Sequence, residues 1–398
     1  MKAVVIAAGQ GTRMGPLTEN RPKPLLPVAG KPILEHVLEA AAPFVDGYVV
    51  VIGYRGDQIK THLGDRFQGH PIQYVTQQEQ LGTAHAIQQA ESHIEEPFLA
   101  LNGDVLLTEE LVQKLATETD TAIATMAVEN PQAYGVIERD GDEVTGIVEK
   151  PDDPPTDLAN LGLYRFTPQI FEFIDQLDLS DRGEYEITDA LTLTLEASRV
   201  TAVEYDGPWL DIGRPWELLE ANTHVLEDAE NRVEGIVEAG ATLTLPVLVE
   251  DGARVRDGTY IEGPVVIKSG ADVGPNAYIR GASVIGENVR VGNAVEIKNS
   301  ILMANASVGH LSYVGDSVLG TDVNFGAGTK VANLRHDDEN VRAQVKGDLV
   351  DTGRRKFGVV VGDGTKTGIN TSLNAGVTLG TETRTGPGEV VRTDKGRD

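Results

Sequence analysis

The sequence contains no cysteine, which excludes thiolate metal sites, disulfides and cysteine nucleophiles. It also contains no apolar stretch long enough to span a bilayer. The chain enters an apolar run at residues 3–6 directly, with no charged and apolar segment typical of a signal peptide. These absences predict a cytoplasmic protein that is not inserted in a membrane.

Basic residues are scarce: 34 Lys and Arg stand against 61 Asp and Glu, a formal charge of −27. Such a charge argues against nucleic acid and anionic membranes as partners. The acidic residues are scattered over the whole chain, which suits a protein kept soluble in high salt, although a merely acidic protein is the alternative. An anionic ligand would need locally placed Arg, Lys, backbone N–H groups or metal ions.

The opening loop, "AAGQGTRMGPLTENRPKPLLP" at residues 7–27, is rich in glycine but lacks two familiar patterns. It has no Gly-Lys-Ser/Thr, so it is not a P-loop, and the dinucleotide fingerprint is broken. Prolines stand where either motif would begin a helix. Ala8 and Gly9 allow backbone N–H groups to approach a nucleotide, while Arg13 and Lys23 supply a forked and a compact cation. Two separated cations suit a triphosphate together with a second phosphate.

Residues 1–228 alternate short apolar runs with helical patterns. Runs at 48–52, 72–75 and 98–101 predict strands, and 32–38 predicts a helix. This alternation predicts an α/β domain with an open, mostly parallel sheet and ligands at the carboxyl ends of its strands.

After a short acidic linker at 229–236, the apolar period changes to six over 237–398. The sixth-residue positions are aliphatic or Met in unbroken succession: Val237, Leu243, Val249, Val255, Ile261, Ile267, Val273, Ile279, Ile285, Val291, Ile297 and Met303. The pattern returns at Val361, Thr367, Leu373 and Leu379. This hexapeptide repeat predicts a left-handed parallel β-helix with the aliphatic side chains stacked inside. The register breaks once, after Met303, next to "GHLSYVGD" at 309–316.

The first half resembles the sugar-1-phosphate nucleotidylyltransferases, which have a Rossmann-like domain, make nucleotide sugars and release pyrophosphate. The resemblance starts in the opening loop. It continues in "QQEQLGTAHA" (77–86), "LNGDVLL" (101–107), "YGVIE" (134–138), "GIVEKP" (146–151), "NLGLY" (160–164), "GEYEITDA" (183–190) and "WLDIGRPWELLEAN" (209–222).

The resemblance implies a role for each matching residue. Arg13 and Lys23 are catalytic and neutralise the reacting phosphates, and Asp104 and Asp211 hold Mg²⁺, which takes one or two carboxylates beside phosphate oxygens. Binding of the nucleotide and the sugar phosphate is implied for the remaining set: Ala8, Gly9, Gln77, Gly82, Thr83, Gly135, Glu149, Lys150 and Asn160. The nucleotide stays open between UTP and dTTP. The segment "EQLGTAHA" resembles the uridylyltransferases, whereas "WLDIGRPWELLEAN" is closer to the thymidylyltransferases.

The second half resembles the acetyltransferase part of the bifunctional GlmU family, in its archaeal form. The matching segments are "VGNAVEIKNS" (291–300) and "SVGHLSYVGDSVLGTDVNFGAGT" (307–329). The resemblance implies His310 as the base that deprotonates an amino sugar, with the sugar phosphate bound by Arg280, Lys298, Tyr313, Asn324 and Asn333. Acetyl-CoA is then expected near 352–370, where Arg354, Arg355 and Lys356 meet its phosphates.

The segment after Asn333, "LRHDDEN", differs from the usual tyrosine-bearing loop, which leaves glucosamine-1-phosphate and galactosamine-1-phosphate both open. A coil that serves only as a trimerisation scaffold, behind a thymidylyl- or uridylyltransferase, is the alternative to a second enzyme. In both cases we expect a homotrimer, because β-helix prisms present flat faces that pack around a three-fold axis.

Overall fold

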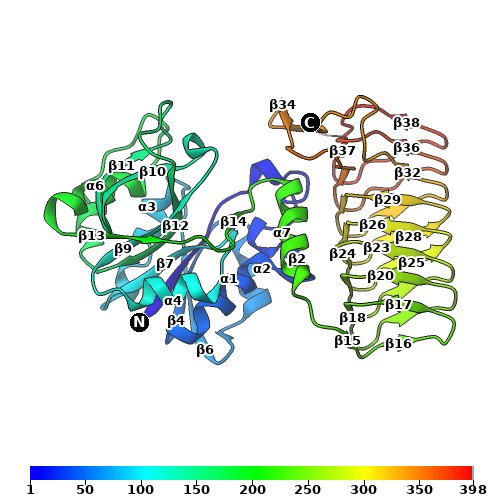
Figure 1. Ribbon diagram of the computed structural model, residues 1–398, viewed down its shortest axis with the longest axis horizontal. Helices are drawn as coiled ribbons and strands as arrows, with labels where there is room; N and C mark the ends of the chain where they lie inside the picture. Colours follow the sequence, from blue (N-terminus) through cyan, green and yellow to red (C-terminus); the bar gives the residue numbers. More distant parts are fainter. Residues whose placement is uncertain (397–398) are drawn as a thin grey trace. The chain divides into compact units, whose positions relative to one another are not determined.

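The structure, a computed structural model, describes residues 1–396 and divides into two compact units. The first, here the sheet unit, comprises Met1–Gln10, Pro22–Leu25 and Ile33–Asp211. The second, here the coil unit, comprises Gly11–Arg21, Leu26–Pro32 and the chain from Ile212 onward (Figure 1). The predicted domain bounds stay a prediction, and the last two residues of the predicted 237–398 domain lie outside the described residues.

The sheet unit is built on a 10-stranded sheet in the order β10-β11-β13-β9-β12-β7-β1-β4-β6-β5. Its strands are β1 (Lys2–Ala7), β4 (Gly47–Ile52), β5 (Arg66–Phe67), β6 (His70–Thr76), β7 (Phe98–Asn102), β9 (Thr121–Ala127), β10 (Gly135–Asp140), β11 (Glu143–Glu149), β12 (Leu158–Phe166) and β13 (Val200–Glu204). A separate ladder joins β8 (Val105–Leu106) to β14 (Leu210–Asp211). The three apolar runs predicted as strands are confirmed as parts of β4, β6 and β7.

Strands β6, β4, β1 and β7 are parallel neighbours and form the centre of the predicted Rossmann-like domain. Strands β1, β4 and β7 are nearly all apolar, because helices cover such a sheet on both faces. Beyond β7 the sheet is mixed: β13 and β9 pair in parallel, as expected, but other strands are antiparallel. There β12 runs antiparallel to both β7 and β9, and β10 and β11 form an antiparallel hairpin. Apolar runs do not encode strand direction, which the connections decide.

The helices of the sheet unit are α1 (Ile33–Ala41), α2 (Gly56–Leu63), α3 (Thr83–Gln88), α4 (Glu109–Thr117), α5 (Ile170–Ile174) and α6 (Ile187–Ala197). The predicted helix is confirmed as α1, with Pro32 immediately before it. The start of α4 follows from its sequence: the Thr108 hydroxyl accepts a hydrogen bond from the Leu111 N–H, and Glu109 and Glu110 occupy the positive end of the helix dipole.

The coil unit contains three parallel sheets, and as far as β29 each strand pairs with the third strand after it in the chain. The first holds β15 (Arg232–Val233), β18 (Val247–Val249), β21 (Val265–Ile267), β24 (Ser283–Ile285), β27 (Ile301–Leu302), β30 (Val318–Leu319), β35 (Val360–Val361) and β37 (Thr378–Leu379). The second holds β16 (Ile236–Val237), β19 (Arg254–Val255), β22 (Asp272–Val273), β25 (Arg290–Asn293), β28 (Ser307–His310) and β31 (Asn324–Phe325). The third holds β17 (Thr242–Thr244), β20 (Tyr260–Glu262), β23 (Tyr278–Arg280), β26 (Glu296–Lys298), β29 (Tyr313–Gly315), β32 (Lys330–Val331), β36 (Ser372–Leu373) and β38 (Val390–Val391).

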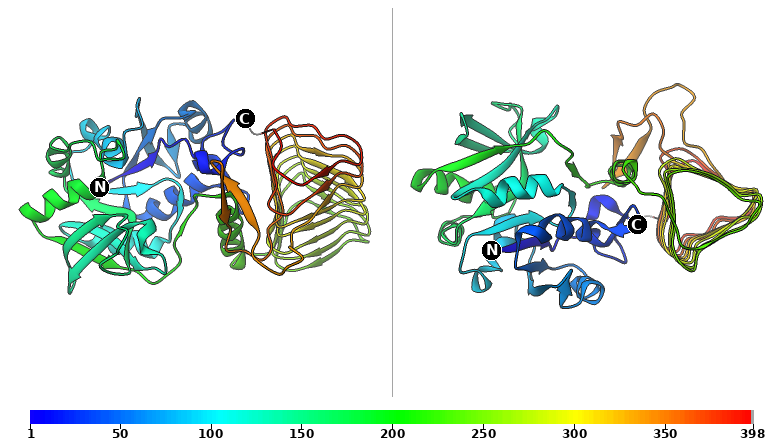
Figure 2. Two further views of the ribbon diagram at one scale, coloured as in Figure 1. Left: turned by 90° about the horizontal axis from the view of Figure 1, so that it is seen from above. Right: turned by 60° about the horizontal axis from the view of Figure 1, so that its bottom comes forward.

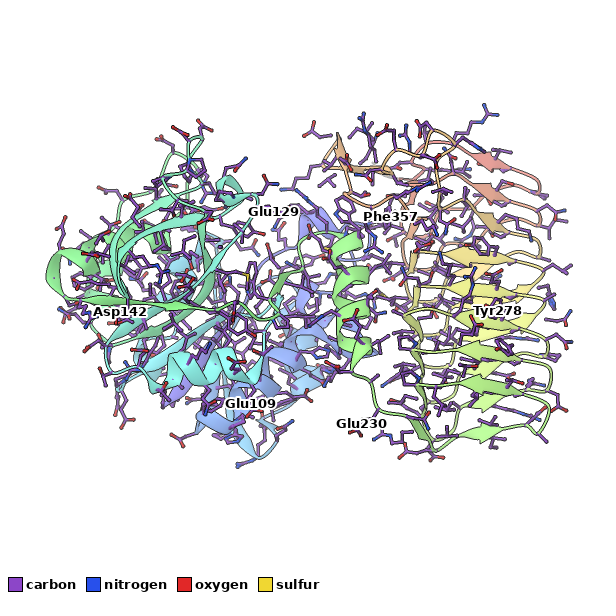
Figure 3. All side chains as sticks on the ribbon, viewed as in Figure 1. Glu109, Glu129, Asp142, Glu230, Tyr278 and Phe357 are labelled. Atoms are coloured by element: carbon purple, nitrogen blue, oxygen red, sulfur yellow. The ribbon has the colours of Figure 1, made fainter. Side chains whose placement is uncertain are left out.

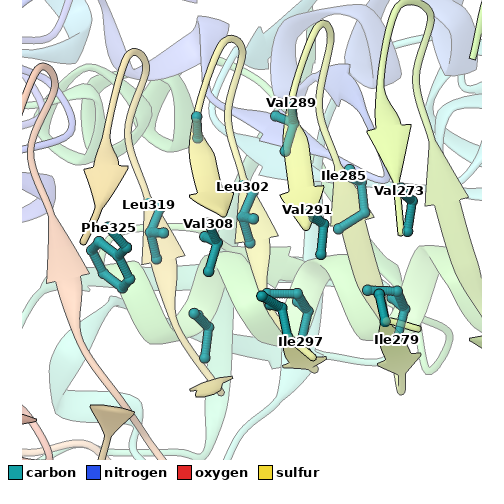
Figure 4. Packing of buried hydrophobic residues seen from close by; sticks show 14 of the residues in the cluster. Val273, Ile279, Ile285, Val289, Val291, Ile297, Leu302, Val308, Leu319 and Phe325 are labelled. Carbon is teal, nitrogen blue, oxygen red and sulfur yellow. The ribbon is translucent and has the colours of Figure 1, made fainter. Parts of the chain in front are cut away.

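Seen along its axis, this part of the chain winds as stacked triangles, an arrangement consistent with the predicted β-helix (Figure 2). The interior is one column of aliphatic side chains, among them Val273, Ile279, Ile285, Val291 and Ile297 (Figure 4). Each stacks on its equivalent in the next coil, because parallel strands in register place equivalent residues above one another.

The expected end of the repeat at Met303 is wrong, because Leu302 is the residue in the interior column. Val266 pairs with Val284 in the usual register, but Val284 pairs with Ile301, one residue early. The missing residue lies at the corner between β26 and β27, because Lys298 and Ile301 are three positions apart, whereas their partners Arg280 and Val284 are four positions apart. The equivalent corner of the next coil, between β29 and β30, is shortened in the same way, since Lys298 pairs with Gly315 and Ile301 with Val318. The sequence showed the slip but misplaced it, because Leu302 and Met303 are both apolar.

The coil is interrupted after β32 by a hairpin of β33 (Arg342–Val345) and β34 (Asp348–Asp351). Phe357 returns the chain to the coil and meets Trp216 of α7 (Pro215–Glu227) edge to face, at 5.8 Å between ring centroids. Figure 3 labels Phe357, as well as Tyr278 on a strand of the third sheet. The hairpin β2 (Pro27–Val28) with β3 (Lys31–Pro32) also belongs to this unit. Among the described residues, no helix is both long and apolar enough to cross a membrane.

Candidate active sites

The first candidate site begins at the carboxyl ends of β1, β4 and β7. A side chain at Gly53 would stand 2.7 Å from the Ala8 carbonyl oxygen, so that strand approaches the opening loop as only glycine permits. Gln80 Nε2 donates to the same carbonyl at 2.8 Å. A Cβ added at Gly9, by contrast, would meet no atom within 4 Å. The loop at Ala8 and Gly9 is therefore held from one side and open at Gly9.

The carboxylates expected to hold a metal lie next to each other in the sheet unit. Asp211 of β14 pairs with Val105 of β8, the residue after Asp104. Lys23 Nζ contacts Asp104 Oδ2 at 2.6 Å, and Lys23 is buried. Two carboxylates beside a phosphate site fit Mg²⁺, which accepts such a partial protein ligand set. No cluster of three or more His, Cys, Asp or Glu that could hold a metal occurs in residues 1–396.

Arg13 belongs to the coil unit, on the short 3-10 helix Thr12–Met14. A Cβ at Gly213 would stand 3.0 Å from Arg13 Nη2, so the guanidinium lies against this glycine. The Gly213 N–H donates to Glu217 Oε2 at 2.7 Å, which fixes the start of α7 beside it. The position of Arg13 thus depends on the segment that follows Asp211.

The residues expected to read the base come together at the start of α3. Gln77 is buried, and its Nε2 donates to the Gly82 carbonyl oxygen at 3.1 Å. Gly82 has φ of 99°, and a Cβ there would stand 2.6 Å from the Tyr185 carbonyl oxygen. Glycine is therefore required, and Thr83 begins the helix immediately after it.

The residues expected to bind the sugar also meet. A Cβ on Gly135 would lie 3.2 Å from Glu149 Oε2 and 3.5 Å from Cβ of Asn160. Glu149 Oε1 lies 3.2 Å from Lys150 Nζ and 3.1 Å from Arg182 Nη2, and the Asn160 amide donates to the Tyr164 hydroxyl at 2.8 Å. This cluster contains one carboxylate and one amide, which suit hydrogen bonds to hydroxyl groups.

In the coil unit, four of the six expected sugar-phosphate and acetyl-transfer residues gather on the third sheet. Arg280 pairs in register with Lys298 on the next strand, and Tyr313 lies one strand further. Asn333 follows β32 and donates to the Tyr313 hydroxyl at 3.1 Å. Burial raises the pKa of Tyr313, so its hydroxyl keeps its proton at neutral pH. Arg280 Nη2 contacts Glu296 at 2.8 Å, and this hydrogen bond raises the pKa of the guanidinium.

The other two expected residues belong to the second sheet. His310 ends β28 with an exposed side chain, and two residues separate it from Tyr313 at the start of β29. Its carbonyl oxygen accepts hydrogen bonds from the Gly328 N–H and the Ser312 hydroxyl, which fix the backbone of this corner. Asn324 lies on the next strand, where it pairs with Ser307. His310 thus lies at the corner between the second and third sheets, and Asn324 lies on the second sheet opposite Ser307.

Of the cations expected near acetyl-CoA, Arg355 contacts Asp338 and Lys356 pairs with Leu334 where the inserted hairpin leaves the coil. Arg354 lies between Thr352 and these residues, with its N–H donating to the Thr352 hydroxyl at 3.2 Å. Two further cations, Lys366 and Arg384, were not among the residues predicted from the sequence. Lys366 pairs with Asn324 through a parallel β-bridge, and Arg384 pairs with Lys366 in the same way. With Asn324 they line a cavity of about 430 Å³.

Both halves of the chain match known protein families. The Nucleotidyl transferase family matches residues 2–228, and the GMPPB C-terminal domain matches residues 261–391. A protein of Methanococcus vannielii named "Bifunctional protein GlmU" is 44% identical over 99% of this chain and 95% of its own length. A "Bifunctional sugar-1-phosphate nucleotidylyltransferase/acetyltransferase" of Sulfurisphaera tokodaii is 39% identical over 100% of this chain and 98% of its own length.

The chain belongs to the bifunctional GlmU family. The resemblance seen in the sequence is thereby confirmed over both halves. A solved UDP-glucose pyrophosphorylase in complex with UDP-glucose is similar to the first half alone, at 26% identity and a TM-score of 0.54, covering 57% of this chain and 99% of that structure.

Two residues of this GlmU-family chain were missed by the sequence analysis. Thr188 is buried, and its methyl group would lie 3.2 Å from a Cβ on Gly135. Its hydroxyl has no hydrogen-bond partner among residues 1–396, which is unusual for a buried polar group. The other is Asp316, a buried carboxylate behind Lys298 and Asn333. The motif "GEYEITDA" contained Thr188, but only packing shows that its hydroxyl is buried.

Proposed function

We propose that the protein catalyses two steps of nucleotide-sugar synthesis. In the first, acetyl-CoA acetylates the amine of glucosamine-1-phosphate or galactosamine-1-phosphate. In the second, a uridylyl group passes from UTP to the resulting N-acetylhexosamine-1-phosphate, giving a UDP-sugar and pyrophosphate, with dTTP as the other candidate nucleotide. The observation that carries the proposal is similarity to bifunctional relatives over nearly the whole chain.

For nucleotidyl transfer, the sugar phosphate oxygen attacks the α-phosphorus while the bond to pyrophosphate breaks. Such reactions depend on positioning and charge neutralisation rather than on covalent catalysis. Lys23 neutralises charge on the phosphates from its buried position beside Asp104. Asp104 and Asp211 would hold Mg²⁺, which supplies charge neutralisation at phosphate oxygens. Gly135, Glu149 and Asn160 orient the sugar, and Lys150 binds its phosphate.

For acetyl transfer, the amine nitrogen attacks the thioester carbonyl carbon and His310 takes the amine proton. The carbon–sulfur bond breaks, and the thiolate of coenzyme A leaves and receives that proton from the imidazolium of His310. A neutral imidazole suits this work near neutral pH. Lys298 and Arg280 face the sugar phosphate, while Tyr313, Asn324 and Asn333 contact the hydroxyl groups. The cavity lined by Lys366 and Arg384 supports a phosphate-bearing part of acetyl-CoA near the later coils.

We further propose that the coil is a left-handed β-helix and assembles as a homotrimer in high salt. Flat parallel sheets such as the second and third support packing around a three-fold axis, which would add side chains of neighbouring copies to each site. Light scattering at working salt tests the assembly, and a monomer would overturn it.

One incubation tests the whole proposal. Protein, acetyl-CoA and either UTP or dTTP are mixed with each hexosamine-1-phosphate, and the products are identified by mass. The expected products are free coenzyme A, pyrophosphate and the nucleotide N-acetylhexosamine. Pyrophosphate without any thiol would favour the alternative, a nucleotidylyltransferase whose coil is only a scaffold.

A further inference from the structure

The corner residue Asp316 has more hydrogen bonds than the coil fold requires. It follows β29, has φ of 50° and is buried. The equivalent corner residues after β23 and β26 are Gly281 and Asn299, also with positive φ. Glycine and asparagine therefore adopt the same left-handed backbone conformation at the equivalent corners of the two preceding coils. The fold alone gives no reason for a carboxylate at residue 316.

The carboxylate of Asp316 is saturated by donors from two neighbouring coils. Its Oδ1 accepts from the Asn299 amide at 2.8 Å. Its Oδ2 accepts from the Asn333 amide at 2.5 Å and lies 3.3 Å from Lys298 Nζ. A buried carboxylate is tolerated only when charge and hydrogen bonds compensate its lost hydration, and here all of its partners are side chains of the candidate site or next to it.

The partners of Asp316 also touch one another. The Asn333 amide donates to the Tyr313 hydroxyl, and both groups lie over Gly315, where a Cβ would stand 2.7 Å from the amide nitrogen and 2.4 Å from the hydroxyl oxygen. The Lys298 side chain is 17% exposed, so only its tip reaches solvent. Asp316 thus fixes the rotamers of a cation, an amide and a phenol that line one surface.

We propose that Asp316 is a positioning residue for acetyl transfer: it holds Lys298 and Asn333 in the orientation that binds the sugar phosphate. This inference rests on the proposed acetyltransferase function. Side chains held by a supporting layer lose less conformational freedom on binding, which strengthens binding without contact to the ligand.

The test uses Asp316→Asn and Asp316→Gly in the full-length protein. Asparagine keeps the shape, but whichever way its amide is turned, an N–H₂ group faces the donors of Asn299 or of Asn333 and Lys298. Glycine keeps the corner and removes every bond. We expect each variant to raise the KM for glucosamine-1-phosphate about 10-fold or more, with the KM for acetyl-CoA and the rate of pyrophosphate release nearly unchanged.

Asp272→Asn is the matched control, because Asp272 is also a carboxylate on the coil paired with a cation, Arg256, at 2.6 Å, outside the candidate site. It should leave acetyl transfer unchanged. In an Asn333→Ala background, the rise in KM caused by Asp316→Asn should be smaller, since the contact between Asp316 and Asn333 is already absent. Variants that keep the wild-type KM, or losses that multiply fully in that background, would overturn the positioning role. Wild-type protein that releases no thiol would instead overturn the proposed acetyl transfer, and this inference with it.

Discussion

The Gly135→Ala substitution tests the sugar site with the smallest change. The added methyl would lie 3.2 Å from Glu149 Oε2 and 3.2 Å from Cγ2 of Thr188, whereas ordinary contact begins at 3.4 Å. Since Gly135 does not have a positive φ, alanine adopts its backbone without strain. The neighbours must move by a few tenths of an ångström. Because a 1 Å misplacement in a site costs about 100-fold, we expect about a 10-fold higher KM for the sugar phosphate, or ~1.4 kcal/mol.

The control lies in the same hairpin. A Cβ on Gly146 would stand equally close, 3.2 Å, to Glu138 Oε1, but that side chain is exposed and can turn away. Pyrophosphate release is measured for both variants against N-acetylglucosamine-1-phosphate and UTP, with thiol release as a second readout. Only Gly135→Ala should lose sugar affinity, and neither should change acetyl transfer. Equal effects of the two substitutions, or a KM for Gly135→Ala within twofold of wild type, would refute the reasoning.

The other predictions concern single contacts. Asp104→Asn should lower the rate of pyrophosphate release by 10²-fold or more, because the metal loses a ligand and Lys23 its partner; a change of only a few-fold would contradict the metal assignment. His310→Ala should lower thiol release by about 10²–10⁴-fold and leave pyrophosphate release intact, while loss of both would point to misfolding. Thr188→Val should keep or raise the unfolding temperature, since valine keeps the shape of threonine and the hydroxyl has no partner to lose within the described chain; a lower unfolding temperature would contradict this reasoning.

Much of the fold followed from the sequence, for a physical reason. Stacked coils demand one inward aliphatic side chain per face, so Val273, Ile279 and Ile285 recur at a fixed interval and can be read directly. The buried parallel strands β1, β4 and β7 can also be recognised in the sequence. Both of their faces are covered, so their residues form continuous apolar runs. The site motifs likewise named residues that the fold brings together, such as Gly135 with Glu149.

Only the tertiary structure decided the rest. The direction of β12 depends on its connections, and the one-residue slip of the coil depends on which of two adjacent apolar residues turns inward. The partners of Asp316 come from residues 298, 299 and 333, and the methyl group of the buried Thr188 lies next to Gly135 of a distant hairpin. A sequence pattern records what each segment repeats locally. It does not record which side chains from separate segments share one surface, because that depends on how the strands pair and the corners turn.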